Sequence, residues 1–497
     1  METPLLSGSS DGDAAAPTKI KMFWEESAKM WRLAAPVGFT SLFQYLNLSA
    51  VTVFVGHLGN LQLSAVSLSY HIIYTISYAI QQGIANAAGT LCGQAYGAGQ
   101  VESLGIYMQK SRIILFITSI ILMPVFIFAS PILKLFGQED DIAELAGQYC
   151  IRIIPAMLSL GINLPTQKFL EAQSKVIVPA WIAFIGLVTQ IGLLYLFIFI
   201  FGWGITGAAI AFDIASWGIT IAQVGYVVVW CKLEGWCGFS WFASKDAWDF
   251  TKFSIASSAM SCLEQWYVVG LNVLAGQLGD AVTAVGSLSI CLNIQYWETM
   301  FLFGINTAIS VRVSNELGMG RAREAKYSVF VASLHSLMSG TLFMILIFVS
   351  KDYLVTIFTN SQEMQGAVTR LAYLLGLSML LNSASQLLSG VAIGGGWQVM
   401  VAYVNLASYY LLGLPLAVLL GFRAKLGVMG ILGGQIFGIT FQVLILLFMT
   451  FKANWDRENT KWESREKVEL FSIERMHFLV FLGESGSPFT LSVLPYL

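Results

Sequence analysis

Charged residues are scarce in this chain: Asp, Glu, Lys and Arg together make up 11% of its 497 residues. Hydrophobic residues make up 56%, and the mean hydropathy is +0.70. This amount of charge is too small to cover the surface of a soluble protein of that length, so most of the surface must contact lipid. The 27 basic and 29 acidic residues give a net charge of −2, which argues against a nucleic-acid partner.

The sequence also lacks the short motifs of several enzyme and metal sites. It contains neither the nucleotide-binding motif GxxxxGK[ST] nor the zinc-protease motif HExxH, and its six cysteines form no CxxC pair. Its four histidines are scattered along the chain. We therefore predict no enzymatic activity, no cofactor and no metal site. Any transport must be driven by an ion gradient or by the gradient of the substrate itself.

Apolar segments of membrane length dominate the chain instead. Runs of roughly 20 apolar residues are long enough to span a bilayer, and the sequence has twelve such segments joined by short loops. They lie at about residues 33–55, 63–87, 110–130, 145–165, 178–201, 205–230, 252–275, 284–308, 325–350, 366–392, 399–421 and 428–451. The fold class predicted from this pattern is an all-α polytopic membrane protein.

Basic residues are unevenly distributed between the loops. Most of the loop lysines and arginines fall on the side of the two termini. The other side receives only Lys134, Lys351, Arg423 and Lys425, with Arg152 and Arg370 near helix ends. By the positive-inside rule, both termini are cytosolic, which requires an even number of spans and agrees with twelve.

An internal repeat divides the chain into two halves. Residues 55–60 (VGHLGN) match 275–280 (AGQLGD), and the SLS of 67–69 recurs at 287–289, both at an offset of 220. Further matches follow at nearly the same offset: 97–99 with 318–320, Gln167 with Gln386, and 204–207 with 427–430. Glycine-rich turns resemble one another by chance, but several pairs at a nearly constant offset do not. Two six-helix lobes related by a pseudo-twofold axis along the membrane normal are typical of secondary transporters.

The repeat predicts the domain boundaries. Residues 1–30 are expected to be a disordered cytosolic N-terminus, 31–230 the N-lobe, 231–251 a cytosolic loop between the lobes, and 252–452 the C-lobe. The last segment, 453–497, is an atypical tail that is too short and too interrupted by glycine and proline to form a thirteenth span.

Glu264 is the most informative single residue. It lies in the middle of 254–274, a segment with no other ionisable group except the phenol of Tyr267. A carboxylate at that depth is costly unless it faces a cavity, a partner or a proton, so it marks a functional site. The repeat places it opposite Gln44, so that only the C-lobe has an ionisable group at this position. Burial in a partly dry cavity favours the protonated carboxyl, which is what coupling to a proton gradient requires.

Other polar residues within the spans are candidates for a substrate site between the lobes. We predict Glu298 as a second proton-coupling residue. The predicted substrate-binding residues are Gln44, Asn47, Gln265, Asn293, Tyr296, Asn382, Gln386 and Tyr410.

Some of these residues have a second interpretation. Gln44, Asn47 and Asn293 could equally make hydrogen bonds that hold helices together. Glu298 follows Tyr296 and Trp297, which could mark a local interface. Asp213 in span 6 is interpreted as a helix-packing acceptor.

The chain resembles plant members of the multidrug and toxic compound extrusion (MATE) family. The resemblance is carried by 91–99 (LCGQAYGAG), 105–109 (GIYMQ), 167–173 (QKFLEAQ), 262–264 (CLE), 312–318 (RVSNELG), 388–391 (LSGV) and 396–398 (GWQ). These motifs follow one another in order over residues 30 to 455. The resemblance implies the MATE fold and proton-coupled antiport of organic compounds by alternating access.

The resemblance also has implications for the site. Glu264 matches the glutamate of the family's Cys-Leu/Met-Glu signature, which is implicated in proton and cation coupling. Animal relatives have additional carboxylates where this chain has Val269, Asn293 and Asn382, which favours neutral or anionic aromatic conjugates over strong organic cations. Bacterial relatives have an aspartate in helix 1, where this chain has Gln44 and Asn47. An N-lobe proton site is therefore not expected.

The likeness is closest to the branch that contains flavonoid transporters. It implies small organic solutes and protons as partners, a monomer surrounded by lipid, and the vacuolar or plasma membrane as location. Sodium in place of protons stays an open alternative. Two other functions also stay open: a flippase for lipids or lipid-linked oligosaccharides, which needs a basic cavity, and a channel or a receptor without transport.

Overall fold

The computed structural model describes residues 19–231, 247–278, 281–358 and 361–456, and all regular elements in these ranges are helices. The N-terminal half contains α1 (Lys19–Gly56), α2 (Asn60–Leu68), the π-helix η1 (Ser69–Tyr74), α3 (Thr75–Gly97), α4 (Val101–Ile127), α5 (Ala129–Leu135), α6 (Asp140–Arg152), α7 (Ile154–Ala172), α8 (Ile177–Tyr195), the π-helix η2 (Leu196–Ile200) and α9 (Gly204–Trp230). The C-terminal half contains α10 (Ala247–Gly276), α11 (Ala281–Gly318), α12 (Ala322–Phe358), α13 (Gln362–Gly395), α14 (Gln398–Asn405), the π-helix η4 (Leu406–Gly413), α15 (Leu414–Val418), the π-helix η5 (Leu419–Arg423) and α16 (Val428–Lys452).

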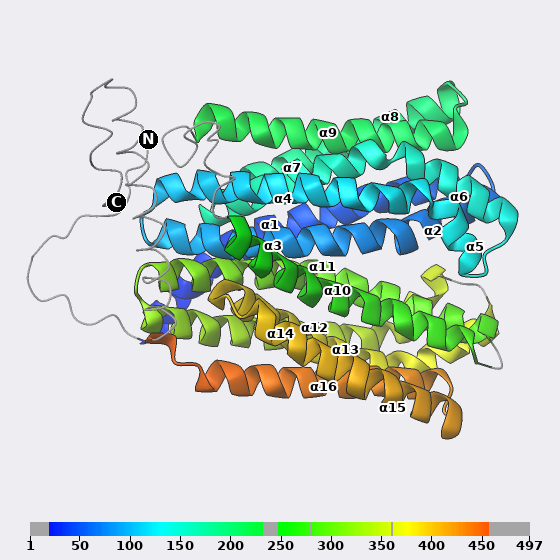
Figure 1. Cartoon of the computed structure of the whole chain (residues 1–497). Coiled ribbons are helices and arrows are strands. Elements are labelled where there is room, and N and C mark those ends of the chain that lie inside the picture. The colour runs from blue at the N-terminus through cyan, green and yellow to red at the C-terminus, as the bar shows by residue number, and fades with distance from the viewer. Residues whose placement is uncertain (1–18, 232–246, 279–280, 359–360, 457–497) are drawn as a thin grey trace, which may run out of the picture.

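The two halves form two lobes of roughly parallel helices that lie one above the other in Figure 1, the N-lobe from blue to green and the C-lobe from green to orange. By length and composition, nine of the described helices can cross a membrane, or ten if the bent pair α6 and α7 counts as one span. Helices α10 and α11 complete the twelve predicted spans, and they are long enough at 30 and 38 residues. They carry Glu264 and Glu298, which lower their hydropathy.

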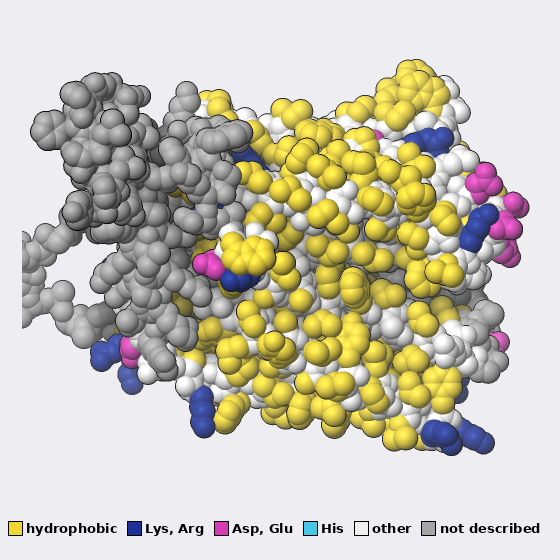
Figure 2. Space-filling view, in the orientation of Figure 1, with side chains coloured by type: hydrophobic (Ala, Val, Ile, Leu, Met, Phe, Trp, Pro, Cys, Tyr) yellow, Lys and Arg dark blue, Asp and Glu magenta, His cyan; other side chains and the backbone are white. Residues whose placement is uncertain are grey.

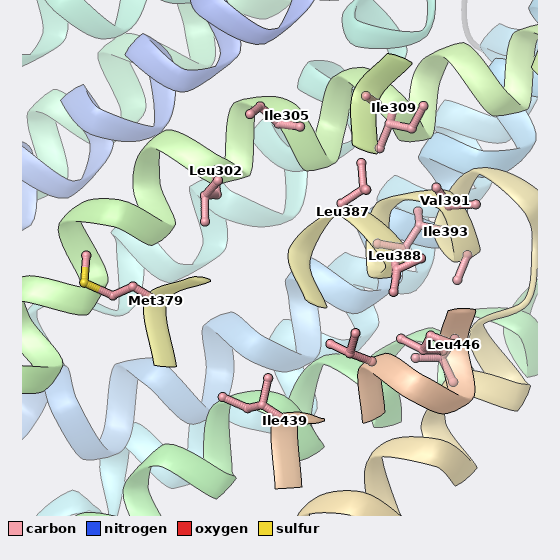
Figure 3. Close-up of a cluster of buried hydrophobic side chains, with 14 of the residues drawn as sticks. Leu302, Ile305, Ile309, Met379, Leu387, Leu388, Val391, Ile393, Ile439 and Leu446 are labelled. Carbon is pink, nitrogen blue, oxygen red and sulfur yellow. The ribbon is translucent and has the colours of Figure 1, made fainter. Parts of the chain in front are cut away.

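Hydrophobic side chains cover the middle of the molecule, as Figure 2 shows, and the charged side chains of this view lie near the two ends of the bundle. Within the C-lobe, apolar side chains from α11, α13 and α16 interlock into one core (Figure 3). Leu302, Ile305 and Ile309 follow the helical spacing of one α11 face and belong to the same buried cluster as Leu388 of α13 and Ile439 of α16. This core fixes the helices that carry the polar site.

The turns of the two lobes confirm the internal repeat. Gly99 and Gly320 both adopt a positive φ, of 76° and 78°, after the equivalent helices α3 and α11. The turns that they close have matching hydrogen bonds, from Gln100 N to Ala95 O and from Arg321 N to Glu316 O. The π-helices η2 and η5 end α8 and α15 at an offset of 223. The same offset relates Gly204 to Gly427, with φ of 55° and 58°.

The expected start of the N-lobe is wrong. Helix α1 begins at Lys19, so residues 19–30 are helical rather than disordered. The first half of α1 packs into the C-lobe core through Met30 and Leu33, and its second half packs into the N-lobe core through Val51. An ion pair holds the first half in place, because Arg312 Nε and Nη2 each donate to Glu26 at 3.0 Å. The sequence does not predict this crossing between lobes, because it marks no boundary between the part of α1 that packs against the C-lobe and the part that packs against the N-lobe. The predicted N-terminal segment before Lys19 and most of the predicted loop and tail lie outside the described residues.

The lobes are in close contact at the end of the bundle where α3 and α11 end. A Cβ atom on Gly97 would lie 2.0 Å from the carbonyl oxygen of Asn315, and one on Gly318 would lie 2.1 Å from that of Gln94. Gly97 and Gly318 are equivalent in the repeat, so the two lobes meet through the same residues on either side of the pseudo-twofold axis. Thr90 Oγ1 adds a hydrogen bond to Ile393 O across the lobes, at 2.6 Å. Only residues without a side chain allow this approach of the two backbones.

Asp213 is a helix-packing acceptor, as the sequence predicts. The bent pair α6 and α7 turns by 47° just before Pro155, which cannot donate a backbone hydrogen bond. Asp213 Oδ1 of α9 accepts the backbone N–H of the buried residue Ala156 in the first turn of α7, at 2.9 Å. A carboxylate at this position satisfies a free donor and complements the helix dipole.

We expect Asp213→Leu to lower the stability of the protein by about 1–3 kcal/mol, because the N–H of Ala156 loses its acceptor inside the membrane. Thermal unfolding in detergent would measure this loss. Thr189→Val on α8 is a matched control, since it removes only a side-chain bond to Ile185 of its own helix. Equal unfolding temperatures for the two variants would contradict the capping role.

Candidate functional site

A polar cavity of about 100 Å³ lies within the C-lobe. Its walls come from α10, α11, α13, η4 and α16, and this volume holds several water molecules. The lining residues are Glu264, Gln265, Tyr267, Val268, Leu292, Gln295, Tyr296, Thr299, Asn382, Ser385, Gln386, Tyr409, Gln435 and Ile439. Among the described residues, Tyr267 Oη and Gln435 Oε1 are buried in this wall without a protein hydrogen-bond partner. Buried polar atoms require partners, so the cavity suits water or a polar solute.

Glu264 is held at the cavity wall by two donors from neighbouring helices. Asn405 Nδ2 donates to Glu264 Oε1 at 3.1 Å, and Ser389 Oγ donates to the same oxygen at 3.4 Å. No charged donor pairs with this carboxylate among the described residues. A carboxylate with two neutral donors and a cavity beside it can exist in charged and protonated forms, which a salt bridge would prevent.

A helix irregularity begins directly after Asn405 and contains Tyr409, which lines the cavity. Helix α14 ends at Asn405, and the wider turn of η4 follows before Pro415. Because Pro415 has no N–H, the regular α-helical pattern cannot continue through this stretch, and π-turns of this kind are frequent at functional sites. The ring of Tyr409 stacks on that of Tyr267, with centroids 4.6 Å apart and planes at 14°.

Glu298 lies behind the cavity wall rather than in it. Its side chain is fully buried, and Asn382 Nδ2 donates to its Oε2 at 3.4 Å and to Thr299 Oγ1 at 3.1 Å. Asn382 itself lines the cavity, as Glu264 does, so Glu298 contacts the cavity wall through this amide. Gln265, Tyr296 and Gln386 also line the cavity. The structure therefore brings together six of the predicted residues around one site.

The other four predicted residues lie outside this cavity wall. Tyr410 is adjacent, and its hydroxyl donates to Leu263 O at 3.2 Å. Asn293 is exposed and donates to Ser289 O of its own helix. In the N-lobe, Asn47 is buried and its backbone oxygen accepts a bond from Gln190, while Gln44 donates to Gln167 at 3.3 Å. Gln44 and Asn47 thus take part in bonds between helices, as their second interpretation predicts, whereas the bond of Asn293 stays within α11.

Gln44 belongs to a second polar cluster at the boundary of the lobes. Gln167 Nε2 donates to Glu171 Oε1 at 2.9 Å, and Lys168 Nζ pairs with Glu171 Oε2 at 2.8 Å. Lys168 and Glu171 face Asn306 and Ser310 of α11 across a small cavity. The pair is buried where the lobes touch, so separation of the lobes would hydrate it.

Sequence and structure comparisons agree on the family. A model of the MatE family matches residues 36–196 and 256–419, which is more than half of the chain. The chain belongs to the MATE family. It is 53% identical to Protein DETOXIFICATION 35 of Arabidopsis thaliana over 442 residues, which cover 89% of this chain and 90% of that protein. It is 52% identical to Protein DETOXIFICATION 34 of the same plant, over 93% of this chain and 86% of that protein.

The MATE fold is also shown by solved structures. The crystal structure of the eukaryotic MATE transporter AtDTX14 matches with a TM-score of 0.85 and 30% identity, over 89% of this chain and 99% of the other. An outward-facing multidrug resistance MATE transporter matches with a TM-score of 0.78 at 17% identity, over 90% and 100%. This MATE protein is therefore a multi-pass membrane transporter for small organic compounds and not an enzyme.

The site of this MATE protein contains residues that the sequence analysis missed. Gln435 and Gln442 lie on α16, seven residues apart and so on one face of the helix. Gln435 Nε2 donates to Gln295 Oε1 at 3.4 Å across the cavity. Two buried glutamines at this spacing in an otherwise apolar span are a detectable signal, because hydrocarbon gives an amide no partner. The described residues contain no group of three or more His, Cys, Asp and Glu that could hold a metal ion.

Proposed function

We propose that this MATE transporter is a proton-coupled antiporter in which Glu264 carries the proton. The observation that carries the proposal is a carboxylate that lies on a polar cavity within the membrane and is bonded only to the neutral donors Asn405 and Ser389. These donors favour the charged form, and the low polarity around them favours the protonated form. The balance allows Glu264 to take up and release a proton in the course of a transport cycle.

Glu298 is proposed as a second proton-binding residue. It contacts the cavity through Asn382, which also bonds Thr299 beside the cavity. Among the described residues, Glu298 Oε1 is buried without a protein partner, which favours the neutral form of this carboxyl. Glu264 and Asn382 line the same cavity, so a change in the charge of Glu264 is expected to act on Glu298 across it, and the two carboxyls are expected to titrate together.

Alternating access requires the lobes to separate where they now touch. The contacts of Gly97 and Gly318 close the molecule on the side where α1 begins and α16 ends. We propose that this side is cytosolic, in keeping with the basic loops. Opening there exposes Lys168, Glu171 and Asn306 and gives cytosolic substrates a path toward the cavity.

The cavity chemistry supports an aromatic substrate without strong positive charge. Tyr267, Tyr296 and Tyr409 supply ring faces, and Gln265, Gln386 and Gln435 supply amides that bond hydroxyl groups. Glu264 is the one acidic residue among the lining residues, so a dicarboxylate site for cations is absent from this wall. We propose flavonoid conjugates or similar secondary metabolites and xenobiotics as cargo, transport by a monomer, and the vacuolar or plasma membrane as location.

Uptake into proteoliposomes tests the function. Purified protein is reconstituted, an inside-acidic pH gradient is imposed, and flavonoid glycosides and a quaternary ammonium cation are offered separately. We expect glycoside uptake that disappears when a protonophore collapses the gradient. Uptake driven by a sodium gradient at equal pH would show sodium coupling instead. Translocation of a fluorescent lipid without any gradient dependence would indicate a flippase.

A further inference from the structure

A buried hydrogen-bond network extends from Glu264 to the last transmembrane helix. We propose that Gln442 of α16 is a positioning residue that holds Asn405 with its NH2 group toward Glu264 and so sets the pH range of proton exchange. The inference rests on the proposed role of Glu264 as proton carrier. Gln442 does not touch the carboxylate and does not line the cavity, so it acts through Asn405.

Both ends of the Gln442 amide are occupied. Its Nε2 donates to Asn405 Oδ1 at 2.8 Å. Its Oε1 accepts from Ser385 Oγ at 2.6 Å and from Tyr409 Oη at 2.7 Å. Gln442 and Asn405 are both fully buried, so solvent water does not replace these bonds.

The direction of donation along this series of hydrogen bonds favours the charged form of Glu264. The two hydroxyls donate to Gln442, Gln442 donates to Asn405, and Asn405 Nδ2 donates to Glu264 Oε1 at 3.1 Å. The other hydrogen of Asn405 Nδ2 points to Met260 O at 3.5 Å, a long bond that supports the same orientation. If Asn405 turned over, its Oδ1 would face Glu264 and would accept a bond only from the protonated carboxyl. Gln442 opposes that turn because its own NH2 group requires an acceptor.

The described residues at the equivalent positions of the N-lobe do not repeat this network. At the offset of 223 that relates Gly204 to Gly427, the N-lobe has Ile219 in place of Gln442 and Phe212 in place of Gln435. Gln44 stands opposite Glu264. Helix α9 of the N-lobe does carry a buried amide, Gln223, but neither polar atom of that side chain has a protein hydrogen-bond partner among the described residues. Among the described residues, a bonded amide that leads to a membrane carboxylate is therefore found on α16, which agrees with a role tied to Glu264.

Other titratable groups near Glu264 are few among the described residues. All but two of them are tyrosines, and they come from α10 itself and from the helices packed against it. They are Cys262 and Tyr267 of α10, Tyr296 and Glu298 of α11, Tyr409 and Tyr410 of η4, and Tyr78 of α3. The lysines and arginines of α4, α11, α13 and α16 lie toward the ends of these helices, away from the cavity. Tyrosines stay neutral in the physiological range. Glu298 is thus the other group whose titration could change the pH profile of exchange. Glu298→Gln removes that titration.

Gln442→Met tests the proposal, because methionine fills a similar volume without hydrogen bonds. With Asn405 released, the carboxylate of Glu264 loses support and the carboxyl keeps its proton to higher pH. The alkaline limb of the pH profile of exchange should therefore move up by about 0.5–1 pH unit. Exchange is measured in proteoliposomes in the wild-type and Glu298→Gln backgrounds. Thr440→Val on the same helix is the control, since it removes only a bond to Ile436 of its own helix.

A double-mutant cycle separates positioning from a structural role. If Gln442 acts through Asn405, then Asn405→Ala shifts the profile in the same direction and Gln442→Met adds little to it. Additive shifts, or an unchanged profile in folded Gln442→Met, would overturn the inference. Should Gln442→Met fail to fold, Tyr409→Phe removes one donor to Gln442 and is expected to give a smaller shift of the same sign. An unchanged pH profile in Tyr409→Phe would likewise overturn the inference about Gln442. Coupled exchange that persists in Glu264→Gln would contradict the proposed role of Glu264 as proton carrier. That result is distinct from a failure of the inference about Gln442.

Discussion

Replacing Glu264 with Gln is expected to abolish proton-coupled transport while the protein still folds and reaches the membrane. Glutamine keeps the shape of the side chain and can still accept bonds from Asn405 and Ser389, but it cannot bind and release a proton. Uptake driven by an imposed pH gradient should fall to that of protein-free vesicles. Substrate affinity should change less, because the remaining cavity wall is intact.

Asp213→Asn is the matched control for this substitution. It also converts a carboxylate within the membrane to an amide, but Asp213 serves as an acceptor for Ala156 N, and the amide oxygen of asparagine can take that bond. We expect Asp213→Asn to retain coupled uptake. Retention of coupled uptake by Glu264→Gln would refute the role of Glu264, whereas loss in both variants would point to a general effect of removing charge from the bundle.

A side chain at Gly97 is expected to prevent the lobes from closing. In Gly97→Val the Cβ would lie 2.0 Å from the backbone oxygen of Asn315, far inside van der Waals contact, and a backbone atom cannot move aside as a flexible side chain can. The transporter should remain open on that side and lose transport entirely. Gly318→Val should act in the same way, since its Cβ would meet the carbonyl of Gln94 at 2.1 Å.

The accessibility of the boundary between the lobes shows whether the Gly97→Val transporter is held open on that side. Ser310 lines the small cavity there, so a cysteine at this position reports separation by its reaction with a membrane-impermeant thiol reagent. We expect Ser310→Cys to react faster in the Gly97→Val background than alone. Gly218→Val on α9 is the control, because nothing lies within 4 Å of a Cβ atom at that position. Loss of transport with unchanged labelling would contradict the steric account.

The lobes and the central residue of the site could be predicted from the sequence. Apolar runs give the spans, and the recurrence of 55–60 as 275–280 gives two lobes of equal topology. Glu264 is detectable because an ionisable residue in hydrocarbon is costly whatever the tertiary structure. Such predictions hold because they depend on the lipid solvent and not on which helices are neighbours.

The partners of Glu264 depend on tertiary packing and were harder to predict. Asn405 and Gln442 come from different spans, and their side chains meet because α14 and α16 pack together in the C-lobe. Asn293 is a different case: its polarity made it a candidate, and it lies exposed on α11 outside this cavity wall. The sequence gives the type of each residue and its approximate depth in the membrane. The rotation of each helix about its own axis, which the sequence does not give, decides which side chains reach the cavity.

Proton movement driven by substrate is the most direct test of proton-coupled antiport through Glu264. Proteoliposomes that contain a pH indicator are preloaded with a flavonoid glycoside at equal internal and external pH, and efflux is started by dilution. If Glu264 couples the two fluxes, glycoside efflux drives protons inward, so the interior of wild-type vesicles acidifies, and Glu264→Gln vesicles show no change. Glycoside efflux from wild-type vesicles without any change in internal pH would contradict proton-coupled antiport through Glu264.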